Sequence, residues 1–244
     1  MPVETPDPRL DGITQEPLRS AQSDGRFAAV VFDFDETIID LERQHTGAYN
    51  ALCNEMGADY SSMPEQMRKA SGSRIIDDIR EMRAHFRWEE SEEELFARRQ
   101  RHFDELCAQA RLELMPGARE TVNALHARGF SLAITSSAVA SSIEAILIRL
   151  GLRDAFSVIV DGSEVVNGKP DPEAYLLTAR RLAVQPEQCL VLEDSQVGVL
   201  AAKQAGMFCV AVPNPRAQSP QDLSAADLVV ERMDDILRFF RPSR

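Results

Sequence analysis

Five short apolar segments, each containing β-branched residues, constrain the fold of this chain more than any other feature of its sequence. They lie at residues 27–36, 131–137, 157–162, 189–195 and 208–213, and a weaker segment follows at 227–230. Short apolar runs that end in turn-forming or acidic residues are typical of strands buried on both faces of a sheet. The sequence therefore predicts a central sheet built from these segments.

Helical patterns fill the intervals between the later strands. They lie at residues 117–129, 139–151, 171–184 and 195–206, with apolar side chains at every third or fourth position. Gly129, Gly151 and Gly206 follow the last periodic residue of three of them, where helices commonly end. Regular alternation of strand and helix predicts an α/β fold, a doubly wound parallel sheet with helices on both faces.

Residues 40–113 interrupt this alternation. They contain three charge-rich helical stretches, at 41–57, 63–86 and 91–110, without a good strand between them. We therefore expect a small all-helical insert at 40–113 within a core domain made of 27–39 and 114–244. Residues 1–26 mix Pro, Gly, Asp, Ser and Gln without an apolar period, so we expect a mobile N-terminal tail.

The composition narrows the possible environments and partners. The chain has 244 residues, 44% hydrophobic and 27% charged, and it lacks both a run of roughly 20 apolar residues and a signal-peptide pattern. We expect a cytoplasmic protein. Its net charge of -12 disfavours nucleic acids and anionic membranes, so a small anionic substrate would need a locally positive site. The four cysteines are dispersed, without zinc-site spacing, and are interpreted as buried thiols.

Polar residues follow the strands at the edge where parallel sheets bind ligands. Asp33 and Asp35 end the first strand, Ser136 the second, and Glu193 with Asp194 the fourth, while Lys169 follows the third. Any one acidic pair could be a solvated strand end or a helix cap. Carboxylates from two strands at one edge repel each other unless a cation lies between them, and oxygen ligands suit Mg²⁺. The set therefore favours a magnesium site.

The same segments carry a family resemblance. DFDET at 33–37, a strand ending in Ser136, GKPDPEAY at 168–175 and LVLEDSQVGVLAAKQAG at 190–206 resemble, in this order, the four motifs of the haloacid dehalogenase superfamily. The resemblance covers residues 27–240 and is to the phosphatase and phosphomutase branch, in which a helical cap occupies the place of the insert. Asp35, the second aspartate of the first motif, indicates phosphoryl transfer rather than dehalogenation.

The resemblance implies a role for each of these residues. Asp33 would attack phosphorus and form an aspartyl-phosphate, and Asp35 would protonate the leaving oxygen and then activate water. Asp33, the Asp35 backbone carbonyl and Asp194 would hold Mg²⁺, with Glu193 as a further ligand or as a residue that orients the others. Ser136, Ser137 and Lys169 would bind phosphoryl oxygens.

Several residues also have a simpler interpretation. Arg74, beside Ser73, matches the place where mutases of this branch bind a second phosphate. It could instead bind the far end of a phosphatase substrate, or simply pair with Asp77 or Asp78 one turn on. Thr37 could form a local hydrogen bond at its turn, and Ser137 could cap the helix at 139–151. His45, near the entrance to the insert, is more typical of a hinge or a surface position.

Two departures from the family pattern bear on function. Glu36 stands where relatives most often have Gly, and Val139 with Ala140 stands where β-phosphoglucomutases carry a Lys-Asn pair. The second departure counts against a mutase. We therefore predict a magnesium-dependent phosphatase for a small phosphorylated metabolite, with a sugar phosphate favoured and a sugar phosphomutase as the alternative. A non-catalytic phosphate-binding module is disfavoured, because it would not need a nucleophile and an acid together.

Overall fold

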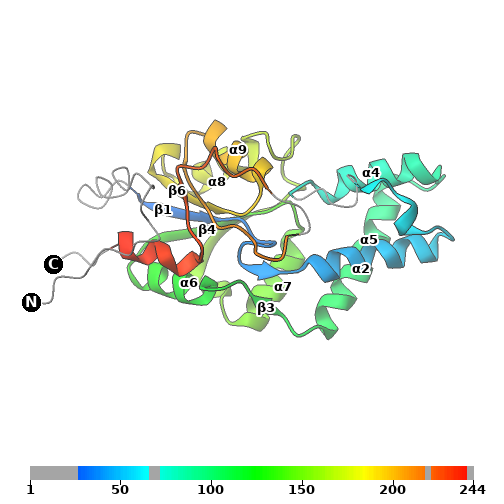
Figure 1. Ribbon diagram of the computed structural model, residues 1–244, viewed down its shortest axis with the longest axis horizontal. Helices are drawn as coiled ribbons and strands as arrows, with labels where there is room; N and C mark the ends of the chain where they lie inside the picture. Colours follow the sequence, from blue (N-terminus) through cyan, green and yellow to red (C-terminus); the bar gives the residue numbers. More distant parts are fainter. Residues whose placement is uncertain (1–26, 66–71, 218–220, 241–244) are drawn as a thin grey trace, which may run out of the picture.

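The computed structural model describes residues 27–65, 72–217 and 221–240, so the tail expected at 1–26 lies outside the described residues. Its centre is a six-stranded sheet in the order β5-β4-β1-β6-β7-β8, in which every neighbouring pair is parallel (Figure 1). The strands are β1 (Ala29–Phe32), β4 (Ser131–Thr135), β5 (Phe156–Val160), β6 (Cys189–Glu193), β7 (Phe208–Ala211) and β8 (Leu228–Val229). The predicted parallel α/β sheet is confirmed.

The apolar strands are buried on both faces because helices cover both faces. Along β1, Val30 and Phe32 pack into one core while Ala29 and Val31 pack into the other, as the two-residue period of a strand requires. Helices α6 (Ala118–Ala127) and α7 (Ala140–Leu150) contribute to the first core, and α8 (Glu173–Leu182) and α9 (Gln196–Gln204) to the second. The sheet is therefore doubly wound.

The three glycines expected at helix ends have left-handed backbone conformations. Gly151 is the C-cap of α7 with φ of 66°, and Gly129 and Gly206 lie just beyond α6 and α9 with φ of 82° and 78°. Glycine adopts such angles without the steric cost that a side chain would impose. The sequence prediction of these three helix ends is confirmed.

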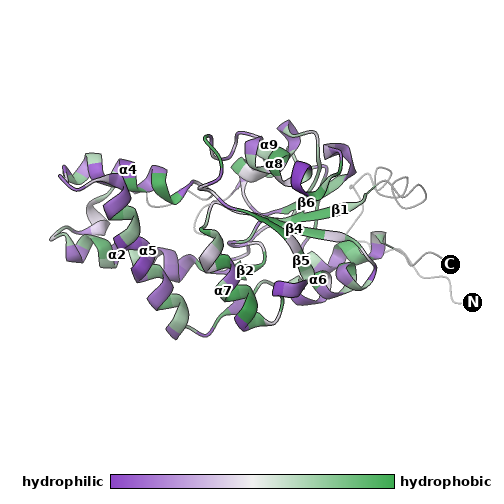
Figure 2. Ribbon diagram, turned by 180° about the vertical axis from the view of Figure 1, so that it is seen from behind, coloured by the Kyte–Doolittle hydropathy of each residue, from purple (hydrophilic) through white to green (hydrophobic). Residues whose placement is uncertain are grey.

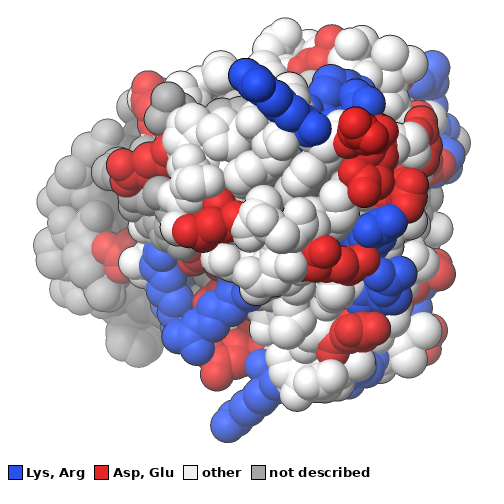
Figure 3. Space-filling view, turned by 90° about the vertical axis from the view of Figure 1, so that its right-hand side faces the viewer, with Lys and Arg blue, Asp and Glu red and all other residues white. Residues whose placement is uncertain are grey.

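The helices within residues 40–113 pack around a small core of their own. They are α2 (Glu42–Glu55), the short 3-10 turn η2 (Tyr60–Ser62), α4 (Ile75–Phe86) and α5 (Glu92–Gln109), at one end of the molecule (Figure 1). Leu52, Ile79 and Leu95 meet there with no exposed surface. The polar faces of these helices point outward (Figure 2), and acidic and basic side chains alternate over this end of the molecule (Figure 3).

A short ribbon joins this helical group to the sheet. Strands β2 (Ile39–Asp40) and β3 (Glu113–Leu114) pair antiparallel, directly across the boundaries expected from the sequence at 39/40 and 113/114. Strands of two residues are too short to produce an alternating pattern, so the sequence did not reveal them. We retain the division into core and insert, hereafter the cap, as a prediction.

Two further expectations bear on environment. All four cysteines are free and buried, as expected from their spacing. Among the described residues, no helix combines the length and the apolar character needed to cross a lipid bilayer.

Candidate active site

Asp33 and Asp35 leave β1 on the same side of the chain. The Asp33 amide still donates to the Leu192 carbonyl at 2.9 Å, which holds the strand end in the sheet. Phe34, between the two aspartates, points into the core and is fully buried. Because side chains alternate along an extended chain, both carboxylates face the carboxyl edge of the sheet. The sequence expectation for this edge is met by the geometry.

Lys169 joins two of the predicted carboxylates. Its Nζ lies 2.6 Å from Asp33 Oδ1 and 2.6 Å from Glu193 Oε1, and only 3% of its side chain is exposed. Burial alone would lower the pKa of Lys169, but Asp33 and Glu193 outweigh it and raise that pKa above its ordinary value. Lys169 is therefore a fixed positive charge behind the nucleophile candidate.

Glu193 is the most completely bonded side chain of the site. Besides Lys169, its Oε1 accepts from the Tyr175 hydroxyl at 2.8 Å. Its Oε2 accepts from the amides of Asp194 and Ser195 at 3.1 Å and from the Ser195 hydroxyl at 3.0 Å. With five donors on two oxygens, Glu193 is better suited to orient Lys169 and the following loop than to bind a metal ion.

The acidic residues fit a divalent cation. Oxygen atoms of Asp33, Glu193 and Asp194 lie within 4.8 Å of one another, and all three residues are buried. Burial, followed by mutual repulsion with Glu193, raises the pKa of Asp194 well above its ordinary value, and burial raises that of Asp33. A bound cation would remove this unfavourable concentration of negative charge, and carboxylate oxygens are the ligands that Mg²⁺ prefers.

Thr37 contributes to this group rather than to its own turn. Its hydroxyl donates to Asp194 Oδ1 at 3.1 Å, a contact across 157 residues of sequence. The local interpretation of Thr37 is therefore wrong. The bond fixes the orientation of the Asp194 carboxyl group.

The two serines after β4 differ in what their hydroxyls can do. Ser136 Oγ accepts from the Ala138 amide at 3.1 Å, which leaves its proton free of the described residues. Ser137 Oγ donates to the Gly72 carbonyl of the cap at 2.9 Å. Ser137 is not the cap of α7, as one interpretation held. Asp161 caps it, because its Oδ2 accepts from the Ala140 amide at 2.8 Å.

Asp35 lies beside His45, a residue whose position in the sequence is more typical of a hinge or a surface. His45 Nε2 lies 3.2 Å from Asp35 Oδ1, and His45 Nδ1 lies 2.5 Å from Arg99 Nη2. Since arginine only donates, Nδ1 must accept, so a neutral His45 carries its proton on Nε2. Nε2 and Asp35 Oδ1 are close, but neither atom has a hydrogen-bond partner among the described residues, so Arg99 positions the His45 ring beside the Asp35 carboxyl without a hydrogen bond between them.

Arg99 could have been recognised in the sequence. It is fully buried on α5 in line with Leu95 and Phe103, and its guanidinium lies 4.5 Å from the Tyr49 ring centroid and 4.9 Å from that of Phe103. Residues four apart lie on the same face of a helix, so a charged residue four positions after one apolar residue and four before another interrupts an apolar face. That interruption is the signal of a buried functional or structural arginine.

Glu36 adopts the backbone conformation expected of the residue it replaces. Its φ of 63° is left-handed, which glycine tolerates best, and its side chain is held by Asn214 Nδ2. Burial, followed by repulsion from Asp40 and Asp35, raises the pKa of Glu36 to about 8. Glu36 therefore adds a further acid to the wall of the site.

Arg74 is engaged away from the other predicted site residues. Its Nε and Nη2 donate to Asp77 at 2.8 and 3.0 Å, and its Nη1 donates to the carbonyls of Val165 and Val166 at 3.0 and 2.7 Å. The simpler interpretation, a pair with Asp77, is confirmed. Arg74 also ties the cap to the loop after β5, and it does not line the cavity described next.

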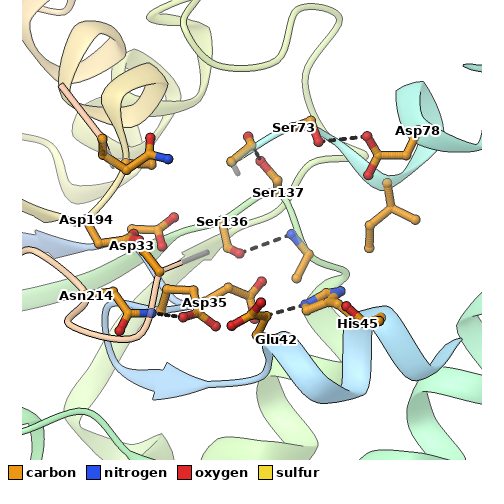
Figure 4. Close-up of a pocket in the computed structure, with 18 of the residues that line it drawn as sticks. Asp33, Asp35, Glu42, His45, Ser73, Asp78, Ser136, Ser137, Asp194 and Asn214 are labelled. Carbon is orange, nitrogen blue, oxygen red and sulfur yellow. Dashed lines mark hydrogen bonds and ion pairs between the residues drawn. The ribbon is translucent and has the colours of Figure 1, made fainter. Parts of the chain in front are cut away.

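A cavity of about 170 Å³ lies between the cap and the sheet edge. Asp33 and Asp194 lie on one side of it and Ser73 and Asp78 on the other, with Ser136 and Ser137 between them (Figure 4). The structure thus gathers the predicted aspartates and serines around one space, with Lys169 and Glu193 directly behind Asp33.

Comparisons with known proteins agree with this arrangement. The family model of haloacid dehalogenase-like hydrolases matches residues 27–206. A probable pseudouridine-5'-phosphatase of Drosophila melanogaster is 35% identical over 84% of this chain and 89% of its own length. The β-phosphoglucomutase of Bacillus subtilis is 31% identical over 85% of this chain and 91% of its own.

A solved structure extends the similarity to three dimensions. CbbY of Rhodobacter sphaeroides, as a variant in complex with xylulose-(1,5)bisphosphate, superposes with a TM-score of 0.76 and 25% identity, covering 86% of this chain and 96% of that one. The family model, the sequence relatives and the fold point the same way: this chain belongs to the haloacid dehalogenase-like hydrolases.

Proposed function

We propose that this chain is a magnesium-dependent phosphatase that hydrolyses the phosphate monoester of a small metabolite through an aspartyl-phosphate on Asp33. The single observation that carries the proposal is the position of Asp33, buried at the strand end, 2.6 Å from Lys169 and two positions before Asp35 in the chain. The names of relatives support a phosphorylated metabolite, because they include a pseudouridine-5'-phosphatase and a β-phosphoglucomutase.

In the first half-reaction Asp33 attacks phosphorus and the bond between phosphorus and the ester oxygen breaks. Lys169 donates to Oδ1 of Asp33, so Oδ2 is the oxygen without a donor from the described residues. Protonated Asp35 gives its proton to the leaving alkoxide, which departs as an alcohol. The free proton of Ser136 is placed to donate to a phosphoryl oxygen.

In the second half-reaction Asp35, now a carboxylate, takes a proton from water. The water oxygen attacks phosphorus, the bond to Asp33 breaks, and inorganic phosphate leaves. His45, held by Arg99, lies 3.2 Å from the Asp35 carboxyl and is close enough to orient it in both steps. When bound by Asp33, the Asp35 carbonyl and Asp194, Mg²⁺ supplies positive charge for the phosphoryl oxygens, with Glu193 orienting this group.

We further propose that the helices of residues 40–113 act as a cap that excludes water from this site. Contacts at the cap loop support the proposal, because Gly72 accepts from Ser137 and Arg74 donates to the loop after β5.

A phosphomutase is the less favoured alternative. A mutase holds a bisphosphorylated intermediate and needs a second cationic site for it. Arg74, the candidate for that site, is occupied by Asp77 and two carbonyls, and Val139 and Ala140 offer no charge. We expect β-glucose 1-phosphate with a trace of bisphosphate to yield free phosphate. Efficient formation of glucose 6-phosphate that is lost in Arg74→Ala would favour the mutase.

The proposed function is tested with p-nitrophenyl phosphate. Wild-type protein should release p-nitrophenol in Mg²⁺, lose that activity in EDTA, and recover it when Mg²⁺ is restored. Asp33→Asn keeps the shape of the side chain and should lower kcat by at least a thousandfold. An exposed matched substitution, Asp59→Asn in the η2 turn, is the control. Residual activity of Asp33→Asn within tenfold of wild type would refute the nucleophile assignment.

A further inference from the structure

The cap end of the cavity contains a set of side chains that the proposed chemistry does not use. Asp78, in the first turn of α4, accepts a hydrogen bond on each carboxylate oxygen. The Tyr49 hydroxyl donates to its Oδ2 at 2.6 Å and the Ser73 hydroxyl to its Oδ1 at 2.7 Å. All three residues line the cavity, and Figure 4 shows Ser73 and Asp78 on the side opposite Asp33.

The direction of these bonds decides what the cap end can recognise. A hydroxyl has one proton and two lone pairs. The hydroxyls of Tyr49 and Ser73 donate their protons to Asp78, so each can only accept a hydrogen bond from a ligand. The carboxylate itself also only accepts while it is ionised. These three side chains therefore form an acceptor surface, and a ligand group that binds to them must donate.

The charges around the cavity act in the same sense. Six of the described residues that line it are acidic, and none of those described is Lys or Arg. Burial raises the pKa of Asp78, and the hydrogen bonds from Tyr49 and Ser73 oppose that rise. The charge of Arg99, which lies 4.5 Å from the Tyr49 ring centroid, also favours the ionised form of Asp78. A phosphoryl group offers several acceptor oxygens and negative charge. A phosphoryl group beside Tyr49, Ser73 and Asp78 would therefore place acceptor oxygens against acceptor oxygens, and negative charge against the Asp78 carboxylate.

We propose that Tyr49, Ser73 and Asp78 select the leaving group, so that the substrate is a monophosphate of a polyhydroxylated alcohol whose distal hydroxyls donate to the cap. This inference rests on the proposed phosphatase function and specifies its substrate class. Bisphosphates should be poorer substrates, because a second phosphoryl group at these three side chains would meet the Asp78 carboxylate and two hydroxyl oxygens that cannot donate. A substrate that leaves a buried polar group of the site without its hydrogen-bond partner commonly loses more binding free energy than one that lacks an apolar contact.

Two substrate pairs test this selection on the wild-type protein in saturating Mg²⁺. Fructose 1-phosphate and fructose 1,6-bisphosphate differ only in the second phosphoryl group, and we expect kcat/KM to be at least tenfold higher for the first. Sorbitol 6-phosphate and hexyl phosphate share a six-carbon chain but differ in hydroxyl donors, and we expect at least a tenfold preference for the first. Equal or reversed preferences in both pairs would overturn the inference.

Variants then locate the selection. Asp78→Asn introduces an amide that can donate to Tyr49 or Ser73 and turn that hydroxyl proton towards the ligand, so the preference for the monophosphate should fall at least fivefold. Ser73→Ala removes one acceptor and should reduce the sorbitol preference, which keeps the test open if Asp78→Asn does not fold. Ser61→Ala is the matched control, because Ser61 donates to Asp59 at 2.7 Å outside the cavity. If Asp78→Asn and Ser73→Ala both show the same substrate preferences as the Ser61→Ala control, the assignment of the selection to these residues is wrong.

The readout separates the inference from the proposed function. If p-nitrophenyl phosphate is hydrolysed but neither pair is discriminated, the selection by the cap is wrong and the phosphatase proposal stands. If no ester is hydrolysed, the proposed function is wrong, and calorimetric titration with the same two pairs decides the selection. Tighter binding of fructose 1-phosphate and of sorbitol 6-phosphate than of their partners would support it, and equal binding would overturn it.

Discussion

Gly198 is the residue at which a single methyl group should damage both stability and catalysis. A Cβ built at Gly198 would lie 1.8 Å from Glu193 Oε1 and 2.0 Å from its Cδ, far inside van der Waals contact. Glu193 cannot move aside at low cost, because it is fully buried and accepts hydrogen bonds from five donors. Gly198→Ala must therefore displace either this carboxylate or the first turn of α9.

The expected loss can be estimated from the bonds that are broken. Disrupting a buried ion pair costs about 3–5 kcal/mol, and replacing glycine by alanine within a helix returns about 1 kcal/mol. A net loss of about 3 kcal/mol should lower Tm by roughly 6–12 °C in a chain of this size. Because Glu193 also orients Lys169, we expect kcat/KM for p-nitrophenyl phosphate to fall by about two orders of magnitude.

Thermal unfolding followed by circular dichroism, together with p-nitrophenyl phosphate kinetics, measures both effects. Gly47→Ala in α2 is the matched control, because its Cβ would lie 2.9 Å from Leu106 Cδ1, at the end of a flexible side chain with 36% of its surface exposed. That variant should keep the activity of wild type, with a Tm equal to that of wild type or up to about 4 °C higher. If Gly198→Ala behaves like Gly47→Ala, the account of Glu193 as a rigid, fully bonded centre is wrong.

Three further variants test other parts of the site. Asp194→Ala should weaken Mg²⁺ binding by more than tenfold in calorimetry. Ca²⁺ should inhibit the wild type, because its looser coordination misplaces the nucleophile. Full activity of the wild type in EDTA would contradict both expectations. Arg99→Met should lower kcat at least tenfold by freeing His45 and Asp35, without lowering Tm, since replacing a buried charge by an apolar side chain is often neutral or stabilising; an unchanged kcat would contradict this role. Burial raises the pKa of Glu36 from 4.5 to about 8, so between these pH values the folded protein retains a proton that the unfolded protein has lost. The free energy of unfolding in EDTA should therefore fall as pH rises from 5 to 8. Glu36→Gln should make this fall less steep, and the same pH dependence in both proteins would refute the account.

Much of the fold and the sheet edge could be predicted from the sequence, for physical reasons. Buried parallel strands have unbroken apolar runs, and their carboxyl ends lie at one edge of the sheet, so the sequence alone predicts Asp33, Lys169 and Asp194 at that edge. The family resemblance then implied roles for them. The geometry brings these residues together as expected, and their chemical roles remain predictions that the variants above test.

Contacts between the cap and the core could not be predicted in the same way. The bond from Thr37 to Asp194 crosses 157 residues, and the contact of Arg99 with His45 depends on how α5 packs against α2. Such pairs follow from tertiary packing, which leaves no periodic signal in the sequence. The ribbon of β2 and β3 was missed for a related reason, because two-residue strands carry no pattern of their own.

The identity of the nucleophile is the central claim, and trapping the covalent intermediate tests it most directly. Acetyl phosphate has a good leaving group, so phosphorylation should be fast and the aspartyl-phosphate should accumulate during turnover in Mg²⁺. Sodium borohydride reduces an acyl phosphate to an alcohol, and mass spectrometry of the digested protein then locates the modified residue. We predict reduction at Asp33, dependent on substrate and absent in Asp33→Asn. Turnover with the modification at another residue, or with none at any aspartate, would contradict the account.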